Sequence, residues 1–134
     1  MITSVAEFRR LRESQEPQEY HRAAWEEAPL EVWHELIEHH PDMRFWVAHN
    51  KTVPHEILAV LANDADSHVR HMVASKNNLQ AHLEVKFSKD PNESVRQVLV
   101  RKRKVSLEAL QQLAQDENAE IRAIAREKIA RRLP

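Results

Sequence analysis

The sequence contains neither cysteine nor glycine among its 134 residues. Without cysteine, the chain can form no disulfide, no thiolate metal site and no cysteine nucleophile. Without glycine, it lacks the residue that Walker loops, dinucleotide-binding turns and nucleophile elbows use where the backbone adopts positive φ or approaches a phosphate closely. These two absences argue against most nucleotide-dependent enzymes.

Long hydrophobic runs are also missing. Charged residues are spread through the first 14 positions, and nowhere do 18 apolar residues follow one another. The sequence therefore predicts neither a secretory signal nor a membrane span, and we expect a cytoplasmic protein that does not bind membranes. A chain of this length can bury a hydrophobic core without disulfides or a metal, so we expect residues 1–134 to form a single domain.

Charge and aromatic residues are unevenly distributed along the chain. Residues 1–66 hold six basic and 13 acidic side chains, whereas residues 100–134 hold nine basic and five acidic ones. Only 5% of the residues are aromatic, and all but Phe87 lie in the first 46 positions. The N-terminal half is thus acidic and aromatic, and either end could attract a partner of opposite charge.

A spacing of 26 residues recurs through most of the chain. It relates one arginine column and one acidic column six residues earlier, namely Arg44, Arg70, Arg96 and Arg122 with Glu38, Asp64, Asp90 and Asp116. The same spacing relates apolar columns, which include Met43, Val69, Val95 and Ile121; Trp46, Met72, Val98 and Ile124; and Val47, Val73, Leu99 and Ala125. The period predicts four copies of one structural unit, with these apolar columns in the core.

Apolar residues within each copy fall at helical spacing on either side of a short polar break, which predicts two helices per copy. Ser4 with Glu7 indicates a capping box, Asp90 before Pro91 indicates an N-cap, and Asn50 stands where a glycine would usually end a helix. We therefore predict an all-α, right-handed α-solenoid of about four 26-residue, two-helix repeats over residues 30–134. An N-terminal helical cap over residues 1–29 would hold helices at about 4–14 and 17–28.

The segment from Thr52 to Ala74 resembles a known repeat family. It combines Thr-x-Pro, Leu-Ala-x-Asp and Val-Arg-x-x-Val-Ala, the pattern of the bacterial leucine-rich-repeat-variant and HEAT-like helical repeats. The resemblance covers about residues 30–130 and is weakest in the third copy, where Phe87–Asp90 reads Phe-Ser-Lys-Asp. It implies a solenoid fold and, because such proteins are mostly binding scaffolds, a binding role.

The arginine and acidic columns are interpreted as structural. An acid and a base that recur in step can bridge neighbouring helix ends or neighbouring repeats, so the whole set should act as a ladder that supports stability. The predicted ladder comprises Glu38, Arg44, Asp64, Arg70, Asp90, Arg96, Asp116 and Arg122.

A partner-binding surface is predicted on the second helix of each copy. Phe45 points about 160° away from the core direction taken from Met43, Trp46 and Val47, and its face is expected to continue through equivalent positions in later copies. With the acidic, aromatic N-terminal half, this surface comprises Trp25, Glu26, Glu27, Phe45, His49, His71, Ser75, Gln97 and Arg101. An aromatic anchor among carboxylates suits a basic protein partner. The alternative is that Phe45 and the tryptophans simply pack the N-terminal cap.

Catalysis, metal and cofactors have no comparable pattern. His34 and His39 are five residues apart, not the four that place two ligands on one helical face, and no catalytic set stands out. We expect a non-enzymatic scaffold that binds a protein, for example an immunity-type inhibitor of a toxin domain. The alternative is nucleic-acid binding through the basic run Arg101–Lys104, which would be similar to the HEAT-like alkylpurine DNA glycosylases. A subunit of a larger assembly is the third option.

Overall fold

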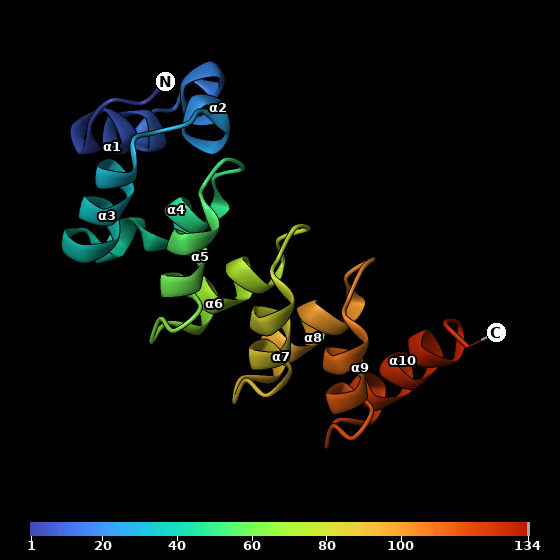
Figure 1. Cartoon of the computed structure of the whole chain (residues 1–134). Coiled ribbons are helices and arrows are strands. Elements are labelled where there is room, and N and C mark those ends of the chain that lie inside the picture. The colour runs from blue at the N-terminus through green and yellow to red at the C-terminus, as the bar shows by residue number, and fades with distance from the viewer. Residues whose placement is uncertain (134) are drawn as a thin grey trace. The chain divides into compact units, whose positions relative to one another are not determined.

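The computed structural model describes residues 1–133, and every regular element in that range is helical (Figure 1). The all-α prediction is confirmed, and each predicted 26-residue copy holds two α-helices. The elements are α1 (Val5–Glu13), α2 (Pro17–Trp25), α3 (Leu30–His39), η1 (Pro41–Met43), α4 (Arg44–His49), α5 (His55–Leu61), α6 (Ser67–Ala74), α7 (Ala81–Ser88), α8 (Glu93–Arg101), α9 (Leu107–Leu113) and α10 (Ala119–Ala130).

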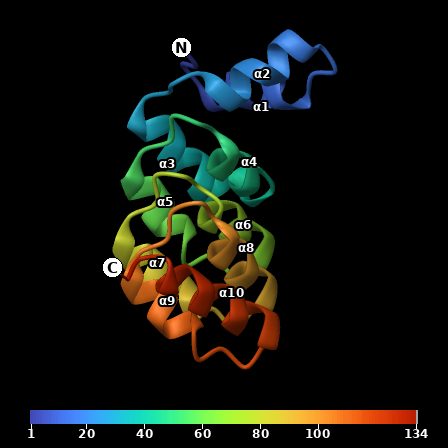
Figure 2. The same ribbon diagram turned by 90° about the vertical axis from the view of Figure 1, so that its right-hand side faces the viewer.

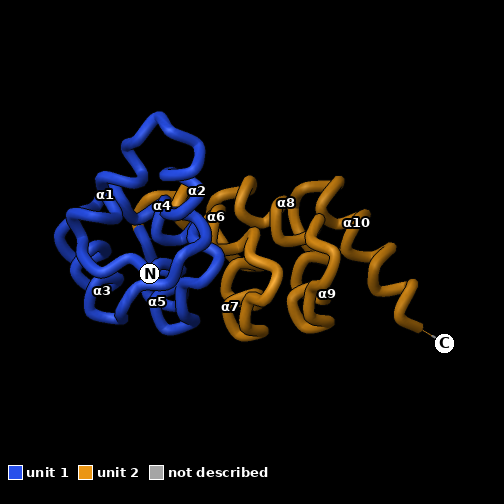
Figure 3. The backbone as a smooth tube through the Cα atoms, turned by 90° about the horizontal axis from the view of Figure 1, so that it is seen from above, with its two compact units in different colours: residues 1–64 blue, residues 65–134 orange. Residues whose placement is uncertain are grey.

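The chain divides into two compact units, residues 1–64 and residues 65–134, called unit 1 and unit 2 (Figure 3). The division falls between α5 and α6, inside the second 26-residue copy. Unit 1 carries six basic and twelve acidic side chains, and unit 2 carries fourteen and nine. The charge asymmetry of the sequence is therefore a difference between the two units.

Unit 1 is built around the contacts of α1 with α2 and α3 and of α4 with α2, α3 and α5. Its core includes Phe8 and Trp33, whose rings meet edge to face with centroids 5.6 Å apart. The predicted cap of α1 is present, because Ser4 Oγ accepts a hydrogen bond from Glu7 N at 3.0 Å. The Glu7 carboxylate reaches back to Thr3 N rather than to Ser4 N, so the capping box closes one residue earlier than usual.

Unit 2 has two layers of helices (Figure 2). The first helices of its copies, α7 and α9, pack against each other, and the second helices α6, α8 and α10 pack in that order. Helices related by 26 residues thus lie side by side within this unit. Buried side chains between the layers include Val73, Phe87, Leu99 and Leu113.

One predicted core column is not buried. Trp46 and its equivalents Met72, Val98 and Ile124 are half-buried in every copy, whereas the Met43 and Val47 columns are buried throughout. On a helix that turns 100° per residue, the column of Trp46 stands about 80° from the midpoint between these two buried columns. The second helices therefore expose part of an apolar column beside the predicted partner-binding positions.

The helix ends are formed without left-handed residues. No residue that the structure describes has positive φ, and Asn50 ends α4 with φ of −58°. The Asn50 side chain, fully buried, instead donates to Ala23 O at 2.8 Å and to Glu26 O at 3.0 Å at the end of α2. The N-cap predicted at Asp90 is wrong, because Asn92 caps α8 by accepting from Ser94 N.

Candidate functional site

The arginine column forms ion pairs with the acid of the following copy. Within unit 2, Arg70 Nε lies 2.9 Å from Asp90 Oδ2, and Arg96 Nε lies 2.8 Å from Asp116 Oδ2. Within unit 1, Arg44 Nη1 lies 3.6 Å from Asp64 Oδ2. Each of these partners stands 20 residues after its arginine, so the ladder joins neighbouring copies.

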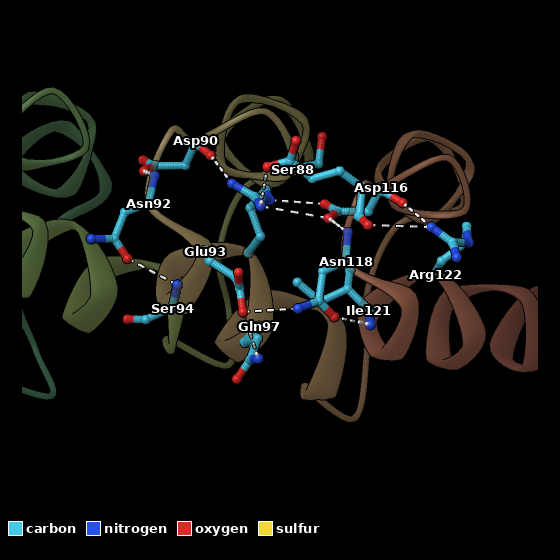
Figure 4. Close-up of polar contacts among 12 residues, drawn as sticks. Ser88, Asp90, Asn92, Glu93, Ser94, Gln97, Asp116, Asn118, Ile121 and Arg122 are labelled. Atoms are coloured by element: carbon cyan, nitrogen blue, oxygen red, sulfur yellow. Dashed lines mark hydrogen bonds and ion pairs between the residues drawn. The ribbon is translucent and has the colours of Figure 1, made fainter.

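In the last two copies, the aspartate six residues before the arginine accepts a hydrogen bond from that arginine through its main-chain carbonyl. Arg96 Nη1 donates to Asp90 O at 2.7 Å, and Arg122 Nη1 donates to Asp116 O at 2.8 Å. The two carboxylates also accept from the main-chain N–H two residues later, at Asn92 and Asn118 (Figure 4). Each aspartate carboxylate thus binds both the main chain at the start of the next helix and the arginine of the preceding copy.

Glu38 is not part of this ladder. Its carboxylate is exposed and lies 3.8 Å from His39 Nε2, while Arg44 Nε donates to Ile37 O at 2.6 Å. The acid six residues before the arginine faces outward at the end of α3, and the chain places no arginine 20 residues before Glu38. The first member of the predicted acidic column therefore lacks the partner that the others have.

A second polar column was not recognised in the sequence. It comprises Asn50, Lys76, Lys102 and Lys128, which have the same 26-residue spacing. Lys128 Nζ donates to Lys102 O at 2.7 Å and also to Val100 O, at the end of α8. Asn50 donates in the same way to carbonyls at the end of α2. Asn50 and Lys128 each tie a second helix, α4 and α10, to C-terminal carbonyls of an earlier helix in the same unit.

Lys102 departs from this pattern. Its Nζ lies 3.6 Å from Glu84 Oε2 and has no hydrogen-bond partner among the described residues. Burial lowers the pKa of the Lys102 ammonium, and the nearby Glu84 charge opposes that shift. Glu84 stands at the position that Leu58 and Leu110 occupy in the second and fourth copies. The third copy therefore has a buried carboxylate, paired with Lys102, where these two copies have a buried leucine.

The predicted partner-binding residues of unit 2 lie on two packed helices, His71 and Ser75 on α6 and Gln97 and Arg101 on α8. The polar side chains of Ser75, Gln97 and Arg101 already have partners inside the unit. Ser75 Oγ donates to Met72 O at 2.6 Å, Gln97 Nε2 donates to Glu93 Oε1 at 3.3 Å, and Arg101 pairs with Glu120.

Unit 1, by contrast, has an aromatic groove. Its volume is about 340 Å³, and it is formed by α1, α2, α4 and Lys51, which follows α4. The lining residues are Arg12, Tyr20, His21, Ala24, Trp25, Trp46, His49 and Lys51. Hydrogen bonds from Asn50 and Lys51 to carbonyls at the end of α2 hold the two walls together. We call this feature the aromatic groove below.

Two cations of the same unit lie over aromatic rings in this groove. The Arg12 guanidinium carbon is 3.5 Å from the centroid of the Trp46 ring, and Lys51 Nζ is 5.9 Å from the Trp25 ring. Phe45 supports the groove from behind Trp46, against which its ring packs edge to face with a centroid distance of 4.8 Å. The Phe45 ring also stacks on His49.

Of the predicted residues in unit 1, Trp25 and His49 line the aromatic groove and Phe45 packs against Trp46 and His49, whereas Glu26 has another role. Glu26 pairs with Arg22 Nε at 2.5 Å and with the amino terminus at 3.0 Å. The hydrogen bond from Arg22 lowers the pKa of the Glu26 carboxyl, with a further contribution from the terminal ammonium. Its charge is therefore used inside unit 1, while the neighbouring Glu27 is exposed.

Sequence reasoning missed Arg12, Tyr20, Trp46 and Lys51 as parts of this site. Trp46 was assigned to the core by its column, and nothing in the sequence places Arg12 of α1 against α4.

Among the residues that the structure describes, no three His, Asp or Glu side chains are placed to hold a metal ion. Nor does that part of the chain contain a helix long and apolar enough to cross a membrane. Comparison of the chain with protein-family models, curated proteins and solved structures finds no match.

Proposed function

We propose that the chain is a non-enzymatic helical-repeat protein of the HEAT-like or leucine-rich-repeat-variant kind that binds another protein. The 26-residue period and the side-by-side packing of equivalent helices within unit 2 support the α-solenoid part of this proposal. Neutralisation of a basic toxin domain, as immunity proteins do, is the most specific form of the binding role.

The aromatic groove is the observation that carries the binding role. Trp25 is 60% exposed at this groove, beside Tyr20 and the half-buried Trp46. Exposing an indole costs hydrophobic free energy, and tryptophan is one of the residues in which the hot spots of protein interfaces are enriched. The excess of acidic side chains on unit 1 adds steering toward a basic partner.

The nucleic-acid alternative loses support at the basic run. Arg101 is exposed but pairs with Glu120, and Lys102 is buried beside Glu84, so Arg103 and Lys104 are the exposed cations of the run that pair with no carboxylate among the described residues. These two side chains help to line an open cavity of about 280 Å³ with Asn77 and Lys102. Two exposed cations form too short a footprint to track a phosphate backbone.

The test is affinity capture from a lysate of the source cell, with nuclease present, using the wild type and two variants. Trp25→Ser removes the exposed indole of the groove, and Val60→Ser is the control, since Val60 is 52% exposed on α5 away from the groove. We expect one protein to be retained at a defined ratio by the wild type and by Val60→Ser and to be lost with Trp25→Ser. Equal capture by all three proteins, or capture of nucleic acid alone, would contradict the proposal.

A further inference from the structure

The six arginine and lysine side chains of unit 1 fall into two groups. Four of them pair with carboxylates of the same unit, namely Arg9, Arg10, Arg22 and Arg44. The other two, Arg12 and Lys51, form no side-chain hydrogen bond or ion pair with any residue in the described range 1–133. Both line the aromatic groove, so the unpaired cations of an acidic unit are gathered at one place.

The guanidinium of Arg12 is held in place, but its hydrogen-bond donors are unused among the described residues. Stacking on Trp46 fixes its position, and its guanidinium carbon lies 5.8 Å from the centroid of the Tyr20 ring. Its five N–H donors have no acceptor among the described residues, and a planar guanidinium with free donors matches a carboxylate in geometry. Lys51 adds a second positive charge, and none of the eight lining residues is acidic.

We propose that the aromatic groove binds a segment of a partner protein that carries an aromatic side chain next to a carboxylate. This inference rests on the proposed protein-binding function and specifies its contact. The aromatic ring of the partner would stack among Tyr20, Trp25 and Trp46, and the carboxylate would pair with Arg12 and Lys51. A partner that is basic overall, as the charge of unit 1 favours, must present this acidic segment locally.

The groove fits a peptide segment better than a nucleic acid. Aromatic rings and cations also bind single-stranded bases, but a polyanion would have to approach a unit with twelve acidic and six basic side chains. The volume of about 340 Å³ lies near the small end of ligand pockets, which suits one side chain and its neighbour. A single carboxylate carries little of the repulsion that a phosphate chain would meet.

The indole N–H signals in NMR spectra of the full chain provide the test, because the three tryptophans are Trp25, Trp33 and Trp46. Trp33 is 1% exposed in the core and is the internal reference. The probe is an N-acetylated, C-amidated pentapeptide with phenylalanine flanked by two aspartates, and the matched peptides carry asparagines or lysines instead. We expect the aspartate peptide to shift the signals of Trp25 and Trp46 alone, and to bind about tenfold more tightly than the asparagine peptide.

Variants connect the binding to the two cations. Arg12→Gln with Lys51→Gln should weaken the aspartate peptide about tenfold, whereas Arg10→Gln on the same helix as Arg12 should leave its affinity unchanged. Lys51→Gln alone, at an exposed side chain, should weaken binding severalfold and serves if the double variant does not fold. Equal affinity for the asparagine or lysine peptide, absence of shifts at Trp25 and Trp46, or stronger binding of an oligothymidylate at the same signals would overturn the inference. The capture experiment with Trp25→Ser is independent of these peptides. If capture depends on Trp25 but the peptide result is negative, the protein-binding proposal holds and only this inference fails.

Discussion

At the scale of single residues, the buried charges of unit 2 determine which substitutions the fold tolerates. Arg96 and Asp116 are each at least nine-tenths buried and are joined by hydrogen bonds of 2.8 and 3.5 Å. Removal of one member would leave the other charge buried without its partner, which costs far more than the loss of an exposed ion pair. The ladder is therefore sensitive to single substitutions, whatever its net contribution to stability.

We expect Arg96→Ala to lower the free energy of unfolding by about 3 kcal/mol, because Asp116 loses its cation and Asp90 O loses a donor. Urea unfolding followed by far-UV circular dichroism measures this change. Arg103→Ala, at an exposed position on the next segment, is the control and should change stability by less than about 0.5 kcal/mol. Similar unfolding curves for the two variants would show that the ladder does not stabilise the protein.

A different outcome is expected for the buried pair of Glu84 and Lys102. Each single variant, Glu84→Leu or Lys102→Met, should cost about 3 kcal/mol because one charge stays buried alone. The double variant restores the leucine found at Leu58 and Leu110 and should be as stable as the wild type or more stable by about 1 kcal/mol. A double-mutant cycle in urea measures the coupling. Additive losses in the double variant would contradict this account.

At the scale of elements, Asn50 fixes α4 against α2. Its amide group donates to two carbonyls at the end of α2, and its Oδ1 accepts from Thr52 N at 2.7 Å. These bonds set the separation of the two helices that form the walls of the aromatic groove. A buried side chain that satisfies helix-end carbonyls does here what a glycine cap does elsewhere.

Asn50→Ala should therefore destabilise unit 1 by about 2 kcal/mol and also disturb the groove. Asn50→Lys is the informative comparison, since lysine occupies this column at Lys128 and donates to carbonyls in the same way. We expect the lysine variant to recover part of the loss. Tryptophan fluorescence during urea unfolding reports stability, and the indole signals of Trp25 and Trp46 report the groove. Unchanged unfolding of Asn50→Ala would mean that the groove is held by other contacts.

The helices could be predicted because they depend on local periodicity, whereas the groove could not. The 26-residue period placed Arg70 and Asp90 in one repeating set, but only the structure shows that they pair with each other across copies. Trp46 shares a column with Met72 and Val98, and a column alone does not distinguish the centre of a buried stripe from its edge. Arg12 meets Trp46 across 34 positions of sequence, a contact that depends on tertiary packing and leaves no local pattern.

At the scale of the whole molecule, the two units differ in how protons affect them. Unit 1 holds Glu7, Glu19 and Glu26, whose pKa values are lowered, first of all by hydrogen bonds from Thr3 N, Arg10 and Arg22 respectively. Unit 2 holds Lys102 and Lys128, whose pKa values are lowered by burial. Carboxyl groups with lowered pKa stabilise the fold at neutral pH, whereas buried lysines with lowered pKa weaken it there.

The signs of these effects lead to opposite pH responses. The contribution of the three carboxylates is complete above their unfolded pKa of about 4.5 and is lost as the pH falls below it. The unfolded chain binds the lysine protons more tightly than the folded chain, so the stability of unit 2 should rise as the pH increases toward about 10.5. Unit 1 should thus weaken in acid, and unit 2 should strengthen in mild alkali.

Tryptophan fluorescence separates the two responses, because all three tryptophans lie in unit 1, while far-UV circular dichroism reports both units. Urea unfolding at pH 3 should show the fluorescence transition at a lower urea concentration than at pH 7. Glu26→Gln should be less stable than the wild type at pH 7, and this difference should shrink below pH 4.5; Glu27→Gln, at the exposed neighbouring carboxylate, is the control variant. Between pH 7 and 10, the dichroism transition should move to higher urea in the wild type and move less in the variant with both Glu84→Leu and Lys102→Met. Because that variant lacks one of the two lysines with lowered pKa, an equal alkaline gain in both proteins would contradict the role assigned to Lys102.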